Sequence, residues 1–138
     1  MSRRAKALGG LAAAYVVLDL VHFADHLRQG RALGPQIYAV GNVGLLAAIV
    51  VAVLALRNNP LAPLLAALYG IAAGVGVLTT HIIPNWWYFS DSYRGLGLDV
   101  WSWMSAWSLV VCGFALAAAG ISLVWHPEAR APRQLANR

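Results

Sequence analysis

The hydrophobic residues fall into four long runs, separated by short segments rich in glycine, proline and polar residues. The runs cover roughly residues 7–27, 36–56, 61–83 and 99–125. Each run has the ~20 mostly apolar residues that a helix needs to cross a bilayer. Residues that end helices lie between and after the runs: Gly30, Gly34, Pro35, Pro60, Pro84 and Pro127. The pattern predicts an all-α integral membrane four-helix bundle, formed by one domain at 1–126 and followed by a short basic tail at 127–138.

The composition supports a membrane protein. Of the 138 residues, 60% are apolar and only 11% are charged. Because a soluble domain carries about 25% charged residues, this chain has too few to build a water-facing surface. A soluble globular domain, a disordered chain and a nucleic-acid-binding domain are therefore excluded. The single cysteine, Cys112, excludes an intramolecular disulfide and a cysteine-based zinc cluster.

The basic residues are unevenly divided between the two sides of such a bundle. With the N-terminus in the cytoplasm, the inner side holds Arg3, Arg4, Lys6, Arg57, Arg130, Arg133 and Arg138. The outer side then holds Arg28, Arg31 and Arg94. The positive-inside rule predicts that both termini are cytoplasmic and that the protein is a multi-pass protein of the plasma (inner) membrane. A cleaved signal peptide is the alternative for the N-terminus, but cleavage after Ala14 would leave a very short apolar stretch.

Ionisable residues inside the apolar runs gather toward the outer side. Asp19, His22 and His26 share one narrow stripe of the first run, because residues three and four apart lie on one face of a helix. His81 lies near the outer end of the third run, and Asp99 opens the fourth. Ionisable residues are costly within a membrane, so their presence indicates a functional site.

The residue types in this group are those of a metal site. Two histidines at i and i+4 can bind one ion from a single helix. The sequence predicts His22, His26 and His81 as ligands, with Asp19 and Asp99 as ligands or as partners that orient the histidines. Nitrogen and carboxylate ligands suit Zn²⁺, Fe²⁺, Mn²⁺ or Cu²⁺ and do not choose between them. In an enzyme, such a metal would activate a bound water, but the sequence assigns no reaction and no catalytic residue.

Three other interpretations of these residues stay open. The first is a structural or accessory membrane protein, in which the polar groups hydrogen-bond across helices. The second is a b-type haem held between His81 and either His22 or His26. The third is proton-coupled transport through Asp19. A four-span chain with an acid in its first span resembles the small multidrug resistance exporters in architecture. Because those proteins use a buried glutamate and have no histidine cluster, the resemblance implies transport but no site residues.

Two further features concern partners. The loop 85–98 starts with an aromatic run, 86–89. This run predicts either a lid over an amphiphilic small molecule or an interfacial anchor; the anchor is favoured because Trp and Tyr prefer the headgroup level. Gly70 and Gly74 form a small-xxx-small pair that lets membrane helices approach closely. We expect this face to pack inside the bundle, and it is also a candidate contact for a homo-oligomer.

Overall fold

The computed structural model describes residues 2–126, which form four long helices and one π-helical turn. These elements are α1 (Arg3–Gln29), α2 (Pro35–Leu56), α3 (Ala62–Val77), the π-helical turn η1 (Leu78–Ile82) and α4 (Val100–Trp125). With η1 continuing α3, all four helices are long and apolar enough to cross a membrane. The predicted all-helical fold with four such helices is confirmed for this part of the chain. The predicted tail at 127–138 lies outside the described residues.

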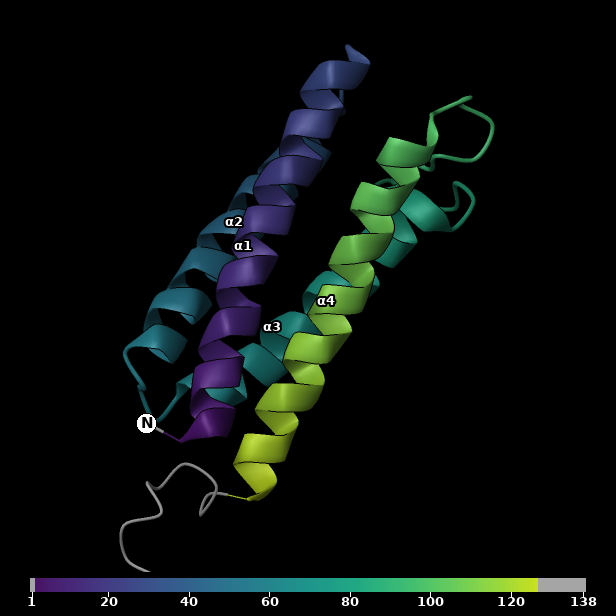
Figure 1. Ribbon diagram of the computed structural model, residues 1–138. Coiled ribbons are helices and arrows are strands. Elements are labelled where there is room, and N and C mark those ends of the chain that lie inside the picture. The colour runs from purple at the N-terminus through teal and green to yellow at the C-terminus, as the bar shows by residue number, and fades with distance from the viewer. Residues whose placement is uncertain (1, 127–138) are drawn as a thin grey trace, which may run out of the picture.

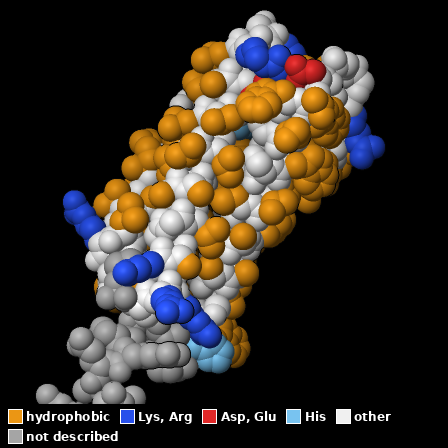
Figure 2. All heavy atoms as spheres, viewed as in Figure 1, with side chains coloured by type: hydrophobic (Ala, Val, Ile, Leu, Met, Phe, Trp, Pro, Cys, Tyr) orange, Lys and Arg blue, Asp and Glu red, His pale blue; other side chains and the backbone are white. Residues whose placement is uncertain are grey.

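Consecutive helices run in opposite directions, so their connections alternate between two ends of the molecule (Figure 1). The segments 30–34 and 83–99 lie at one end, which we call the loop end. The N-terminus, the turn 57–61 and the end of α4 lie at the other. Charged side chains occur at both ends, and hydrophobic side chains cover much of the surface between them (Figure 2). This distribution suits helices whose middle parts face lipid.

Local sequence explains how several of the helices begin and end. The Asp99 carboxylate caps α4 by accepting a hydrogen bond from the Ser102 backbone N–H at 3.1 Å. α1 ends at Gly30, whose φ of 63° is left-handed and therefore favours glycine. Pro35 lies in the first turn of α2, where its missing N–H has no helical partner to lose.

α3 and α4 pack backbone to backbone at glycines. A Cβ atom at Gly70 would lie 2.5 Å from the carbonyl oxygen of Gly113, and one at Gly120 would lie 2.5 Å from that of Pro63. Both distances are too short for a real side chain, so glycine sets the separation of these helices. Gly74 also faces α4. As expected from the sequence, the Gly70/Gly74 face packs inside the chain. Because it is covered by α4, we do not propose it as an oligomer contact.

Buried apolar and buried polar residues occupy different parts of the fold. One apolar cluster joins α1, α2, α3 and α4 and contains Leu8, Ala12, Val51, Ala52, Ala55, Ala62, Ala66, Leu116 and Leu123. The buried polar residues come from the parts of the helices and of the loop that lie toward the loop end. They are His22, Asp25, His26, His81, Ser92, Ser102 and Ser105. The fold thus concentrates buried polar groups near one end.

Candidate metal centre

Three histidines from two segments of the chain meet in the interior. His22 and His26 project from one face of α1, and His81 comes from η1. Their ring centroids are 4.7 Å (His22–His26), 5.0 Å (His22–His81) and 5.1 Å (His26–His81) apart. All three residues are buried, and each offers one ring nitrogen that lies within 4.8 Å of the others. This histidine group could hold a metal ion.

The surroundings of His22 determine which of its nitrogens can bind a cation. The Ser105 hydroxyl donates to the backbone carbonyl oxygen of Ser102 at 2.8 Å. The Ser105 oxygen is therefore the acceptor for Nδ1 of His22, at 3.1 Å. With the proton on Nδ1, the lone pair lies on Nε2. This Nε2 atom is buried and has no hydrogen-bond partner within residues 2–126.

His81 is oriented in the same way by a different partner. Its Nδ1 lies 3.1 Å from the backbone carbonyl oxygen of Asp91, which can only accept a hydrogen bond. Nδ1 therefore carries the proton and Nε2 carries the lone pair. Metal-binding histidines are commonly held by such a bond from the second ring nitrogen. Asp91 is itself fixed by a 2.7 Å ion pair with Arg31 and by its backbone N–H, which donates to the Thr80 carbonyl at 2.9 Å.

His26 contributes the third nitrogen. Its Nδ1 is buried and, like Nε2 of His22, has no hydrogen-bond partner in the described part of the chain. Its Nε2 lies 3.5 Å from the Tyr93 hydroxyl oxygen, at the outer limit of a hydrogen bond. Donation from Nε2 to that oxygen leaves the Nδ1 lone pair available to a cation.

Tyr93 closes the loop side of the histidine group, and the sequence did not predict this. Its side chain is buried, and its ring centroid lies 4.8 Å from that of His81. The loop returns to η1 because the Tyr93 backbone N–H donates to the carbonyl of His81 at 2.9 Å, and Nε of Arg94 donates to that of Ile82 at 3.1 Å. Burial raises the pKa of the Tyr93 hydroxyl, which therefore stays neutral. A single polar-turn tyrosine carries no periodic signal that could have revealed this position.

The aromatic run of the same loop behaves differently. Trp86 and Tyr88 are 60% and 70% exposed, so their rings lie on the surface rather than over the histidines. Trp86 stacks on Trp87 with ring centroids 5.0 Å apart. Phe89, the last residue of the run, lines the cavity that the histidines also line. The rings of the histidine group are contacted by the second half of the loop, through Tyr93.

Neither predicted aspartate joins the three histidines. Asp99 accepts two hydrogen bonds from the Arg28 guanidinium, at 2.8 and 2.9 Å, and its side chain is 52% exposed. These hydrogen bonds lower its pKa. Asp99 thus caps α4 and pairs with Arg28, and it is not part of the histidine group. Asp19 lies one turn before His22, half-buried in the wall of a cavity that the histidines also line.

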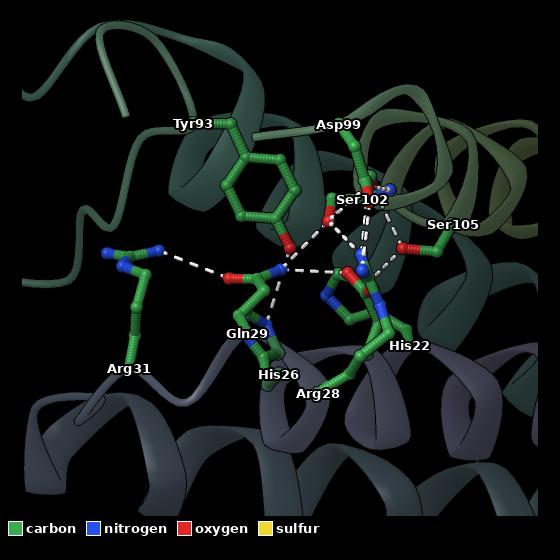
Figure 3. A network of polar contacts seen from close by, with 10 residues as sticks. His22, His26, Arg28, Gln29, Arg31, Tyr93, Asp99, Ser102 and Ser105 are labelled. Carbon is green, nitrogen blue, oxygen red and sulfur yellow. Dashed lines mark hydrogen bonds and ion pairs between the residues drawn. The ribbon is translucent and has the colours of Figure 1, made fainter. Parts of the chain in front are cut away.

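A polar network ties the end of α1 to the start of α4 (Figure 3). The side chain of Asp25 is fully buried and accepts from Nε of Arg28 at 2.9 Å and from Nε2 of Gln29 at 2.8 Å. Arg28 bridges Asp25 to Asp99, and both Arg28 and Gln29 reach the Ser102 hydroxyl. This network fixes the two helices at the depth where His22 meets α4.

A cavity of about 400 Å³ lies beside the histidine group, between α1, α2 and α3. Its wall includes all three histidines and Asp19. A cation held by three nitrogens would keep a coordination position open, as in catalytic zinc sites. The cavity offers space for a molecule next to that position.

Comparison with protein-family models, curated proteins and solved structures finds no match to this chain. The functional interpretation therefore rests on the geometry of the histidine group, its hydrogen-bond partners and the adjoining cavity.

Proposed function

We propose that this chain is an integral membrane protein that binds one divalent transition-metal ion through His22, His26 and His81. The observation that carries the proposal is the pair of buried ring nitrogens without a hydrogen-bond partner, Nε2 of His22 and Nδ1 of His26. Leaving a buried polar atom unpaired costs about 1–3 kcal/mol. A cation shared with His81 would satisfy both atoms at once.

The spacing of the nitrogens is compatible with a small cation. Bonds of about 2.1 Å in a tetrahedral site place ligand nitrogens about 3.4 Å apart. One ring nitrogen of each histidine lies within 4.8 Å of the other two, so modest rotation of the rings would bring three nitrogens to one ion. Imidazole ligands suit zinc, iron or copper, and manganese is also accepted when a carboxylate or water contributes. The open position beside a cavity favours a membrane metalloenzyme or metal-handling protein over a purely structural metal.

Ring packing favours a single ion over a haem. A bis-histidine haem places its macrocycle between the two axial rings. Here His22 and His26 each lie about 5 Å from His81, with centroid distances of 5.0 and 5.1 Å, so the rings are in contact. A haem would require the helices to separate, whereas an ion requires only small movements of side chains.

Metal analysis of the detergent-purified, tag-free protein tests the proposal. After incubation with Zn²⁺ and removal of the excess, we expect about one equivalent of metal per chain. His22→Ala and His81→Ala should lose it. His126→Ala is the matched control, because His126 lies at the opposite end of α4 from the group. Circular dichroism verifies that each variant is folded. Wild type without metal, or equal metal in all the variants, would contradict the proposal.

We also propose that both termini are cytoplasmic and that the loop end faces outward. The excess of Lys and Arg predicted for the inner side supports this orientation. In a Cys112→Ala background, an impermeant maleimide added to intact cells should label Ala32→Cys, which lies at the loop end. Asn59→Cys, in the turn at the other end, should be labelled only after permeabilisation. The reverse pattern would contradict the orientation.

A further inference from the structure

The cavity beside the histidine group combines an apolar wall with a few polar groups. Its apolar lining includes Phe23, Ile37, Leu45, Ala72 and Val77. Its polar lining includes the three histidines, Asp19, Asn42 and Tyr69. Small-molecule sites typically have volumes of about 300–1,000 Å³ and this division of polar and apolar groups. The volume of about 400 Å³ lies within that range.

Three glycines in the cavity wall leave its space unfilled. Gly41 and Gly44 come from α2, and Gly76 comes from α3. A Cβ atom at any of them would meet nothing within 4 Å. Protein interiors are normally close-packed, with few voids larger than a water molecule. A space of this size, lined by three histidines and by an aspartate, indicates a ligand.

The cavity borders the lipid-facing surface of α2. Its wall includes Val40 and Val43, which are 58% and 67% exposed. In a membrane, exposed apolar residues of this kind contact acyl chains. A molecule dissolved in the bilayer therefore has direct access to the cavity.

The polar groups of the cavity determine which chemical group at the end of such a molecule binds best. Asp19 lies on the same face of α1 as His22, and no hydrogen bond or ion pair to its carboxylate is formed within residues 2–126. A hydroxyl can use its oxygen to occupy the open metal position and donate its proton to Asp19. A carboxylate end could also occupy the metal position, but it has no proton to donate to Asp19 and would oppose its charge. A hydrocarbon end would leave both groups unsatisfied.

We propose that this cavity binds a single-chain lipid alcohol, with its chain along Gly41, Gly44 and Gly76 and its hydroxyl at the histidine group beside Asp19. The hydroxyl contact with metal rests on the proposed function. The chain site does not, because it depends on the shape of the cavity.

Photolabelling with a diazirine analogue of dodecanol tests the site in the full-length protein. We expect cross-links on cavity-lining residues of α2 and α3, suppressed by unlabelled dodecanol. Dodecane should compete about tenfold less well, the effect of losing one hydrogen bond to a charged group. Asp19→Asn should reduce the preference for dodecanol over dodecane. Equal competition by dodecane would overturn the hydroxyl end of the proposal.

Cavity-filling variants provide the decisive control. Gly41→Leu and Gly76→Leu place side chains in open space, so the fold should persist while labelling falls. Gly10→Leu is the matched control, because a Cβ there also meets nothing within 4 Å and Gly10 does not line the cavity. Labelling that is equal in all three variants would overturn the site.

Metal content measured on the same samples separates the two proposals. If the protein binds metal but labelling is unchanged in the cavity-filling variants, the lipid site is overturned and the metal site stands. Wild type without metal would overturn the proposed function. The lipid site would then be judged by the glycine variants alone, and the metal contact of the hydroxyl would be lost.

Discussion

α3 presents glycine on two faces, one toward α4 and one toward the cavity. Toward α4, a Cβ atom at Gly70 would lie 2.5 Å from a backbone oxygen. Toward the cavity, a Cβ atom at Gly76 would meet nothing within 4 Å. Gly74 and Gly76 differ in direction by about 200°, since successive residues of a helix are about 100° apart. Glycine thus allows close contact between helices on the α4 face and leaves open space on the cavity face.

The buried polar groups show the same division. On the side of α4, Nδ1 of His22 is paired with Ser105, and Arg28 is paired with Asp99. On the cavity side, the Asp19 carboxylate forms no hydrogen bond or ion pair within residues 2–126, and the buried Nε2 of His22 also has no partner there. The α4 side is therefore a scaffold whose groups are already satisfied. The cavity side is where a ligand can still gain binding energy.

The largest expected effect comes from filling the α4 face. Gly70→Leu places a side chain against the backbone of α4 and should lower the free energy of unfolding by about 3 kcal/mol or more, or prevent folding. SDS titration followed by circular dichroism measures the change. Gly76→Leu, on the open face, should change the same quantity by less than about 1 kcal/mol. Similar losses for the two variants would remove the distinction between the faces.

A smaller effect should come from the partner that orients His22. Ser105→Ala removes the acceptor of Nδ1 and should weaken metal binding about 10–100-fold, as other losses of such partners do. Titration against a chromophoric chelator measures the affinity. Ser108→Ala is the control, because that hydroxyl donates to the Ser105 carbonyl at 2.7 Å and forms no bond with the histidines. Unchanged affinity in Ser105→Ala would show that α4 does not orient the ligand.

Gly76→Ala should have a still smaller effect on stability. The added methyl group enters open space, and alanine favours a helix over glycine by about 1 kcal/mol. The free energy of unfolding should therefore stay constant or rise by no more than about this amount. Loss of stability in the SDS titration would show that the cavity face is more tightly packed than Gly76 indicates.

The smallest effect should be the pH dependence of the Arg28–Asp99 pair. Because hydrogen bonds from Arg28 lower the pKa of Asp99, its contribution to stability is present above the ordinary value of about 3.9 and is lost as pH falls through the lowered pKa. Asp99→Asn keeps a capping side chain but removes the charge. Wild type and variant should differ slightly at pH 7 in low salt and converge in acid. A difference that widens in acid would contradict the role of the pair.

Much of the fold could be predicted because its signals are local. Long apolar runs and their breakers predict the four helices, and the spacing of His22 and His26 places both on one face of α1. Gly70 and Gly74 predicted close packing on the basis of their spacing alone. His81 joined these residues as expected, although the π-helical turn that carries it gave no sequence signal.

The parts that could not be predicted depend on contacts between distant segments. The sequence predicts Asp99 as a ligand or as a partner that orients the histidines, but Arg28, 71 residues away in sequence, hydrogen-bonds to both of its oxygens. The sequence assigned no role to Tyr93, yet its part of the loop folds over η1 and buries the ring. Periodicity cannot report such contacts, since they depend on how irregular segments pack.

By itself, the sequence determined four apolar helices, the concentration of histidine and aspartate toward one side, and the inward packing of the Gly70/Gly74 face. These properties follow from hydrophobicity and from the repeat of the α-helix, which act within a single segment. The tertiary structure confirmed that the three predicted histidines meet, and it alone decided that both aspartates stay outside their group and that a cavity remains beside them. Those outcomes depend on long-range packing, in which each polar atom takes whichever partner the neighbouring helices bring within reach.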